Sequence, residues 1–295
     1  MKLLGSAQGL PSNLAKRKRI DFAFKILCAG AALVGVIILI LLLYRIFADG
    51  IGRLSIGFLR GDISQRPLKA GIWPAIVGTG YVMLLTGVIA VPVGVAAAIY
   101  LEEFTPQKNK FTEFIQLNIA NLAGVPSIVY GLLGLAVFVR YAGMGTSMLA
   151  GALTMALLIL PMIIIVTQES LRAVPSSFRE ASLGLGSTLW QAIRYQVLPS
   201  ALPGIFTGII LALSRAIGET APLVVVGAVV GIVSTPTSLR DRYTALPLQI
   251  FNWAQDPRAE AHRVSAAAIV VLMIGLLFLN SIAIVLRNRA KQRRS

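Results

Sequence analysis

Long apolar runs separated by short polar segments dominate this chain. Charged residues are absent from the apolar runs at 26–43, 72–100, 118–139, 148–166 and 264–286. A further apolar stretch at 201–233 contains Arg215 and Glu219. Because about 20 apolar residues cross the hydrocarbon core of a bilayer, the pattern predicts an all-α polytopic membrane protein with six transmembrane helices.

The first apolar run predicts a retained helix and not a cleaved leader. It is longer than the roughly 7–15 apolar residues of a signal peptide, and no A-x-A site follows it. We therefore expect a basic N-terminal segment (1–21), a transmembrane domain (22–286) and a basic tail (287–295). The longest polar connection inside the domain is 167–200, and it has helical character.

Composition and charge support a membrane location. Hydrophobic residues make up 56% of the chain and charged residues 13%, and the mean hydropathy is +0.79. The net charge of +15 comes largely from basic residues that flank apolar runs, which predicts a membrane protein and not a nucleic-acid-binding one. Both ends are basic, so the positive-inside rule places both termini and the 167–200 connection in the cytoplasm.

The chain offers no constellation for covalent chemistry. Cys28 and His262 are single residues of their kind, which excludes a disulfide within the chain and a Cys or His metal cluster. No Gly-Lys pair occurs, so the chain has no P-loop of its own. We therefore expect no catalytic residues, no metal and no cofactor.

A stripe of small residues marks the third apolar run. Gly124, Ser127, Gly131 and Gly134 lie on one helix face, close to Pro126. The stripe predicts tight helix packing with a proline kink. In the alternative interpretation, Ser127 and a loosened backbone line a substrate pathway.

Two opposite charges lie within the 201–233 stretch. A charge in the bilayer costs at least about 2.5–3.5 kcal/mol, so Arg215 and Glu219 must pair or serve a pathway. Their spacing of four predicts one helix face, with Gly204 and Gly208 nearer the cytoplasm for close helix packing. Either the pair only locks packing, or Arg215 offers planar donors to a passing oxyanion. The stretch is too long for one span, and we expect Pro222 to break it.

The 167–200 connection carries the most specific motif. Glu180-Ala181-Ser182, Gly186 and Leu198-Pro199 resemble the "EAA" loop of ABC importer permeases. Ser182 replaces an alanine of that pattern, and Gln196 stands where it has isoleucine. The resemblance implies a coupling helix that docks on a separate ATPase subunit, with Glu180, Ala181 and Gly186 at the anchor positions.

Two further stretches narrow the resemblance. "LAGVPSIVYGLLGLAVFV" and "SRAIGETAPL" resemble the phosphate-specific importer permeases, and the second is similar to the PstA-type subunit. This implies the type I ABC importer permease fold in a bacterial inner membrane. It also implies a related PstC-type permease, two copies of a cytoplasmic ATPase subunit and an extracytoplasmic phosphate-binding protein as partners, with ATP hydrolysis in the partners alone.

Three alternatives stay open from the residues alone. Chemistry that accepts phosphate would also accept sulfate or molybdate. An ion-coupled secondary transporter would need a coupling carboxylate and inverted repeats; Glu219 is the one acid within the predicted spans, and no repeat is evident. A receptor or assembly protein without transport would have no use for an ATPase-docking motif.

Overall fold

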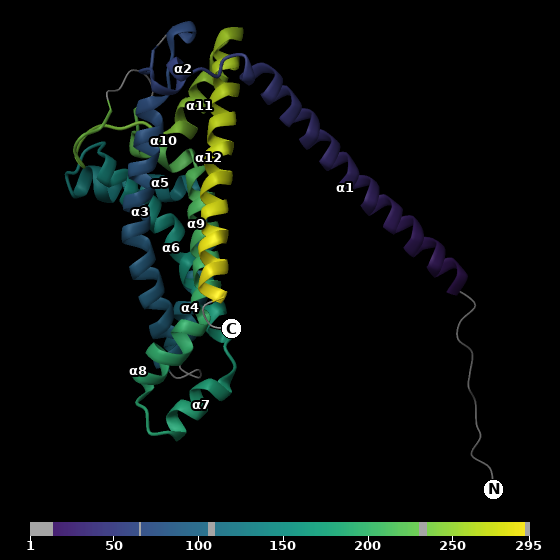
Figure 1. Cartoon of the computed structure of the whole chain (residues 1–295), viewed down its shortest axis with the longest axis vertical. Helices are drawn as coiled ribbons and strands as arrows, with labels where there is room; N and C mark the ends of the chain where they lie inside the picture. Colours follow the sequence, from purple (N-terminus) through teal and green to yellow (C-terminus); the bar gives the residue numbers. More distant parts are fainter. Residues whose placement is uncertain (1–13, 65, 106–109, 230–234, 293–295) are drawn as a thin grey trace. The chain divides into compact units, whose positions relative to one another are not determined.

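The computed structural model describes residues 14–64, 66–105, 110–229 and 235–292. Within these residues every regular element is helical, as predicted. The chain divides into two compact units, residues 1–48 and 49–295. The first unit consists of most of α1 (Leu14–Ile51), and the second holds all the other elements (Figure 1).

The helices of the second unit follow the apolar runs closely. The longest are α3 (Trp73–Ile99), α6 (Met148–Arg172), α9 (Leu198–Ile217) and α12 (Ala259–Gln292). Shorter helices are α2 (Ile56–Arg60), α4 (Lys110–Ala123), α5 (Ser127–Gly134), α7 (Ser176–Gly184), α8 (Leu189–Ala192), α10 (Ala221–Val226) and α11 (Leu246–Gln255). Helical turn η2 (Tyr100–Phe104) extends α3, and η3 (Leu135–Tyr141) extends α5. The turn η4 (Ile193–Val197) joins α8 to α9, and η1 (Pro67–Lys69) stands between α2 and α3.

Five of the predicted spans appear as single helical stretches. They cover residues 17–51, 73–104, 148–172, 189–217 and 259–281, and each is long and apolar enough to cross a membrane. The third predicted span, 118–139, is instead a pair of helices that meet at 102°. The described part of the chain therefore has five candidate spans, or six when the bent pair counts as one.

The bend in the third span has a local cause. Pro126 has no backbone N–H, and it disfavours helical geometry at Val125, the residue before it. Helix α4 ends at Ala123, and α5 begins at Ser127 with Pro126 as its N-cap. The predicted proline kink is thus present, but it is a complete break that separates two helices.

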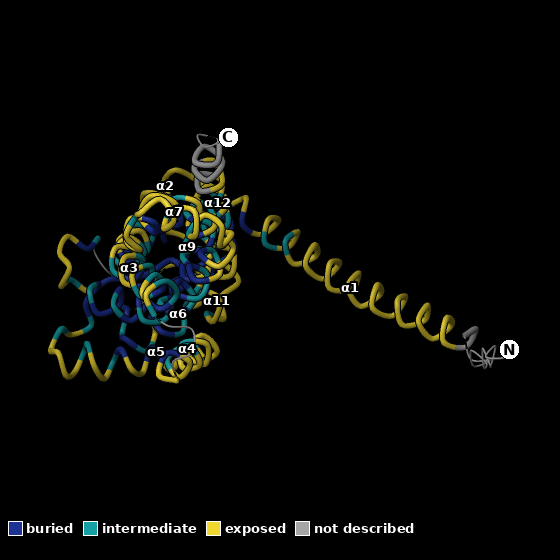
Figure 2. The backbone as a smooth tube through the Cα atoms, turned by 90° about the horizontal axis from the view of Figure 1, so that it is seen from below, coloured by how far each residue is buried: buried dark blue, intermediate teal, exposed yellow. Residues whose placement is uncertain are grey.

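Helix α6 forms the centre of the second unit. It packs against both α3 and α9, and much of its backbone trace is coloured as buried (Figure 2). Its buried residues include Met155, Ile159 and Ile163. Glycines allow these helices to approach closely: a Cβ at Gly94 would lie 2.7 Å from Ile163, and one at Gly204 would lie 2.7 Å from Ser170. In lipid, such dense packing drives helix association, because burial of apolar surface adds little there.

The fifth span ends earlier than expected. Helix α9 stops at Ile217, and Gly218 is its C-cap. Pro222 does not break the helix; it lies in the first turn of α10, where a residue without an N–H is well tolerated. The break thus lies at 218–220, ahead of the proline.

The two ends of the second unit differ in structure. Helices α7 and α8 lie at one end, while α2 and α11 lie at the opposite end (Figure 1). Helix α1 starts before residue 22, and α12 continues past residue 286. Helical structure therefore extends beyond the apolar runs, and the predicted boundaries at 21 and 286 stay predictions about the membrane.

Candidate functional site

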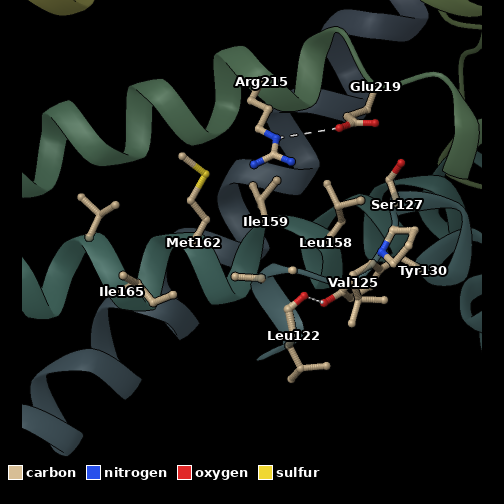
Figure 3. A pocket seen from close by; sticks show the side chains of 14 residues that line it. Leu122, Val125, Ser127, Tyr130, Leu158, Ile159, Met162, Ile165, Arg215 and Glu219 are labelled. Atoms are coloured by element: carbon tan, nitrogen blue, oxygen red, sulfur yellow. Dashed lines mark hydrogen bonds and ion pairs between the residues drawn. The ribbon is translucent and has the colours of Figure 1, made fainter. Parts of the chain in front are cut away.

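A cavity of about 490 Å³ lies beside the break in the third span. Helix α6 forms one wall, the α4–α5 break a second, and the end of α9 a third (Figure 3). The lining residues are Leu122, Ala123, Gly124, Val125, Pro126, Ser127, Tyr130, Leu158, Ile159, Met162, Ile165, Val166, Arg215 and Glu219. All three side chains predicted to line a pathway, Ser127, Arg215 and Glu219, therefore border the same cavity.

Arg215 and Glu219 form a loose ion pair. Their nearest atoms, Arg215 Nε and Glu219 Oε1, are 3.9 Å apart, which is longer than a hydrogen bond. The expected shared helix face is absent, because α9 ends at Ile217 and Glu219 lies beyond it. The Arg215 side chain is 64% exposed and that of Glu219 21% within this chain.

The guanidinium of Arg215 is available to a ligand. No hydrogen bond of this side chain is found within the described residues, and its outer nitrogens point towards α6 and the cavity (Figure 3). Planar N–H groups arranged as a fork suit an oxyanion. The N-terminus of α5 at Ser127 borders the same cavity, and the helix dipole adds positive potential there.

Apolar side chains make up most of the remaining wall. Leu158, Ile159 and Met162 come from α6, and they lower the local dielectric around the charges. Glu219 brings a negative charge to the same cavity, so an anion bound at Arg215 meets both attraction and repulsion. Such a site can hold an anion and release it again.

Two hydrogen bonds that the sequence did not reveal involve helices that carry cavity residues. The Tyr130 hydroxyl donates to the Leu122 carbonyl at 2.8 Å, across the α4–α5 break. The Ser214 hydroxyl donates to Asn280 Oδ1 at 2.5 Å and ties the end of α9 to α12. Tyr130 and Leu122 are 8 positions apart, on either side of the helix break, and Ser214 and Asn280 are 66 positions apart, so the pattern of apolar positions indicated neither bond.

The predicted packing glycines of the third span are confirmed in part. A Cβ at Gly131 would lie 2.8 Å from Pro222 Cα, and one at Gly134 would clash with Thr154. Gly124 meets only its own helix end, and it borders the cavity. The stripe thus gives close packing along α5 and forms part of a cavity wall at its start, and the pathway role of Ser127 stays a prediction.

Helix α7 presents the predicted coupling residues on an exposed surface. Glu180 and Ala181 are exposed, and no residue of α7 is buried. Gly186 follows the helix with φ of +85°. Its N–H bonds to the Leu183 carbonyl at 2.9 Å, and the Ser187 N–H bonds to the Ser182 carbonyl at 3.2 Å. This is a Schellman motif, in which glycine is required for the left-handed backbone.

Gly186 thus has a conformational role at the end of α7. Nothing within the described part of the chain lies within 4 Å of a Cβ built there, and the docking role of this residue on an ATPase subunit stays a prediction. The glycine's own backbone angle already explains its identity. A bulky substitution at Gly186 would therefore distort the end of α7 before it could report on docking.

Large apolar side chains surround the coupling residues. The exposed ones in this region are Phe178, Leu183, Leu185, Leu189 and Trp190. A reciprocal capping box between Thr188 and Gln191 starts α8. Gln196, the departure from the EAA pattern, is exposed, while Ile193 and Val197 beside it are buried. The substitution therefore leaves the packing of this helix intact.

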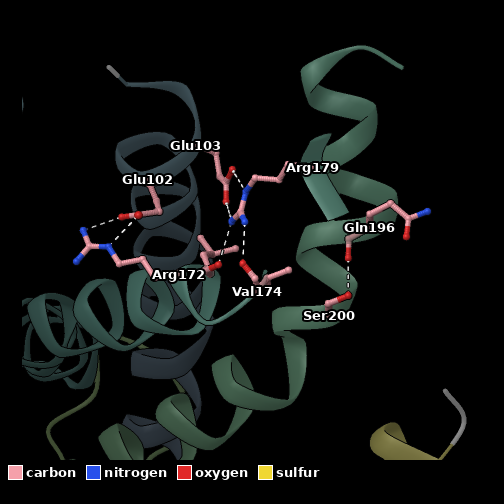
Figure 4. Close-up of polar contacts among 8 residues, drawn as sticks. Glu102, Glu103, Arg172, Val174, Arg179, Gln196 and Ser200 are labelled. Carbon is pink, nitrogen blue, oxygen red and sulfur yellow. Dashed lines mark hydrogen bonds and ion pairs between the residues drawn. The ribbon is translucent and has the colours of Figure 1, made fainter. Parts of the chain in front are cut away.

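Two arginine–glutamate pairs fix this region to the end of α3 (Figure 4). Arg172 binds Glu102 through Nε at 2.8 Å and through a terminal nitrogen at 2.8 Å. Arg179 binds Glu103 at 3.0 and 2.5 Å. The hydrogen bonds to the Glu103 carboxylate raise the pKa of Arg179. Adjacent glutamates at the end of an apolar run were the only sequence signal for these pairs.

The site contains no sign of metal or covalent chemistry within the described residues. No group of three or more His, Cys, Asp or Glu side chains there could hold a metal ion. The arrangement combines a cavity lined by Arg215 and Glu219 with an exposed helix that follows α6 directly in the chain.

Comparisons with known proteins agree on one family. Residues 90–293 match the family described as "Binding-protein-dependent transport system inner membrane component". The chain is 37% identical over 193 residues to a probable ABC transporter permease protein, YqgI, of Bacillus subtilis (strain 168), and spans 65% of that relative's length. It is 33% identical to the phosphate transport system permease protein PstA of Yersinia pestis. That match extends over 272 residues, which are 90% of this chain and 89% of the relative.

A third relative and two solved structures complete the comparison. The phosphate transport system permease protein PstA 1 of Mycobacterium tuberculosis (strain ATCC 25618 / H37Rv) is 34% identical over 80% of this chain and 75% of its own. An inward-facing structure of the MetNI methionine ABC transporter matches with TM-score 0.62 at 18% identity, over 74% of this chain and 97% of the other. A bacterial ABC transporter involved in alginate import matches with TM-score 0.57 at 16% identity, over 90% and 98%.

Proposed function

Because the chain belongs to the family of binding-protein-dependent transport system inner membrane components, we propose that it is the PstA-type permease subunit of an ATP-driven phosphate importer. It is a multi-pass inner membrane protein with the fold of type I ABC importer permeases. As a permease component it is not itself the catalytic subunit. We assign ATP hydrolysis to partner subunits.

The observation that carries the proposal is the Arg215 guanidinium, which faces a cavity also lined by Ser127 and Glu219. Its planar donors match the oxygens of a tetrahedral oxyanion. We favour phosphate over sulfate or molybdate because the two PstA relatives described above are named as phosphate transport system permease proteins. The geometry by itself suits all three anions.

The mechanism follows from the loose ion pair. Phosphate would displace the weak Glu219 contact and accept hydrogen bonds from Arg215, with the Ser127 hydroxyl as a further donor or acceptor. The Glu219 carboxylate would then regain Arg215 as the anion leaves, so the affinity stays moderate. Alternating exposure of the cavity to the two sides would move the anion across the membrane.

Coupling would come from the exposed end of the molecule. We propose that α7, with Glu180 and Ala181, docks on one of two copies of an ATPase subunit. Exposed apolar side chains beside it, such as Leu185 and Trp190, would add contact area. A related PstC-type permease would complete the pathway, and an extracytoplasmic phosphate-binding protein would deliver the anion. Both termini would then be cytoplasmic, with α7 on the same side.

The proposal is tested by reconstituting the complex. The chain would be purified with the products of neighbouring genes and placed in proteoliposomes with ATP inside. Phosphate with its binding protein should stimulate ATP hydrolysis and drive uptake, whereas sulfate and molybdate should do neither. Uptake of sulfate or molybdate instead would assign another oxyanion, and uptake that follows an ion gradient without ATP would contradict the ABC assignment.

A further inference from the structure

Arg179 connects three separate elements at the end of the molecule that carries α7. It donates to Glu103 on η2 through Nε at 3.0 Å and through a terminal nitrogen at 2.5 Å. It also donates to the carbonyls of Leu171, in the last turn of α6, and Val174, just after it, both at 2.9 Å. One side chain on α7 thus binds the ends of both α3 and α6 (Figure 4).

The Arg179–Glu103 pair is stronger than an ordinary surface ion pair. Its side chains are 22% and 5% exposed, and the contact is bidentate. Charge-assisted, two-pronged hydrogen bonds of this kind are shorter and about twice as strong as neutral ones. The two carbonyls also lie at the helix C-terminus of α6, where backbone acceptors otherwise lack helical partners. The arginine therefore satisfies several groups at once.

Packing alone holds α7 only weakly. None of its residues is buried, so no apolar core of its own fixes it to the body. By contrast, α3 and α6 pack along their length, and the Thr86 hydroxyl of α3 donates to the Ala152 carbonyl of α6. Helix α7 is joined to α6 by the short segment 173–175 and contacts α8 and η4, while the Arg179 hydrogen bonds to Glu103 attach it to the end of α3. Because α3 and α6 pack together, a displacement that reaches α3 also reaches α6.

We propose that Arg179 and Glu103 form the joint that passes movement of α7 to α3 and α6, and so to the cavity wall formed by Ile159 and Met162. Arg179 is a positioning residue, because it touches neither the anion nor ATP. The inference rests on the proposed function, in which α7 docks on an ATPase subunit. It adds the physical link between that docking surface and the Arg215 cavity.

Arg172 supplies a matched control. It makes a similar bidentate pair with Glu102 one residue away from Glu103. However, Arg172 lies at the end of α6, which already packs against α3. Its side chain is 54% exposed. Removal of this pair therefore leaves the connection from α7 to α3 in place.

The test compares Arg179→Gln, Glu103→Gln, their double variant and Arg172→Gln in the complete complex in proteoliposomes. The measured quantities are complex yield, ATP hydrolysis and uptake of inorganic phosphate. We expect Arg179→Gln and Glu103→Gln to keep ATPase subunits bound but to lower phosphate imported per ATP by about fivefold, as positions that carry coupling can. The double variant should fall no further than Arg179→Gln alone, because both changes break one joint.

Arg172→Gln should retain the wild-type ratio of phosphate to ATP. The inference is overturned if Arg179→Gln keeps that ratio, or if its only defect is a lower yield of assembled complex. It is also overturned if Arg172→Gln lowers the ratio equally. Failure of the proposed function would look different, since the wild-type complex itself would then import no phosphate. In that event, binding-protein stimulation of ATP hydrolysis in Arg179→Gln still decides the inference: loss supports the joint, and full stimulation overturns it.

Discussion

Gly186 illustrates how one backbone angle shapes a docking surface. Its φ of +85° lies in the left-handed region, which costs an L-residue roughly 1–2 kcal/mol. Gly184, two residues earlier, closes α7 without a positive φ, and a Cβ there would meet nothing within 4 Å. Since a Cβ has open space at both glycines, the two positions differ only in the backbone requirement at Gly186.

Gly186→Ala should weaken binding of the ATPase subunit. The substitution strains the turn that ends α7, and a cost of about 1–2 kcal/mol corresponds to a roughly five- to thirty-fold rise in Kd. Gly184→Ala is the control and should leave Kd within about twofold, since alanine favours the helix. The Kd is measured with the purified chain in nanodiscs and the isolated ATPase subunit. Equal Kd values for the two variants would refute the conformational role.

The helices α6 and α9 depend on glycine at their crossing. A Cβ at Gly208 would clash with the Val166 side chain. Gly80 on α3 is exposed, and a Cβ at that position would meet no other atom within 4 Å. Both are helical glycines, but only the first lies at a helix–helix contact.

Gly208→Ala should therefore destabilise the protein, by about 1–3 kcal/mol as expected for an overpacked contact. Gly80→Ala should be neutral or stabilising by up to about 1 kcal/mol, through helix propensity. Thermal unfolding in detergent, followed by helical circular dichroism, measures both effects. A Tm for Gly208→Ala at or above that of Gly80→Ala would contradict the packing described for α6 and α9.

The lengths of the apolar runs predicted most of the long helices, because every helix that crosses a bilayer needs about 20 apolar residues. The runs at 72–100, 148–166 and 264–286 correspond to α3, α6 and α12. These lengths failed where backbone chemistry decides: Pro126 turned one run into two helices at 102°, and the end of α9 at Ile217 separated Arg215 from Glu219.

The candidate site was predictable in its residues but not in its geometry. An arginine, a glutamate and a serine in apolar runs are conspicuous because charge and polarity cost free energy there. The sequence could not show that they border one cavity, since that depends on how α5, α6 and α9 pack. Arg179 and Glu103 lie 76 positions apart, and no local pattern relates them.

For the whole molecule, we predict on which side of the membrane each connecting segment lies. With Cys28→Ser as background, a cysteine in place of Arg240 should react with a membrane-impermeant thiol reagent added to intact cells. A cysteine in place of Glu180 should react only after the membrane is opened, because α7 and both termini face the cytoplasm in the proposed topology. Both positions are exposed, so access depends on the side of the membrane. The reverse labelling pattern would invert the topology.

The pathway through the cavity is the central claim, and charge removal tests it. Arg215→Gln together with Glu219→Gln removes both charges and nearly keeps the side-chain volumes. Because the pair is loose and both charges are removed together, which is often neutral for an ion pair away from water, the change should cost little stability. Glu219→Gln alone keeps the guanidinium and serves as the matched control; it should still import phosphate, with altered affinity.

The decisive measurement is ATP-driven phosphate uptake per assembled complex for this double variant. The account predicts normal assembly and bound ATPase subunits, with uptake lower by about 10- to 100-fold, the loss expected when hydrogen bonds from a charged group worth about 1.5–3 kcal/mol are removed. Uptake close to that of the wild-type complex would contradict the account and leave Arg215 and Glu219 as structural residues.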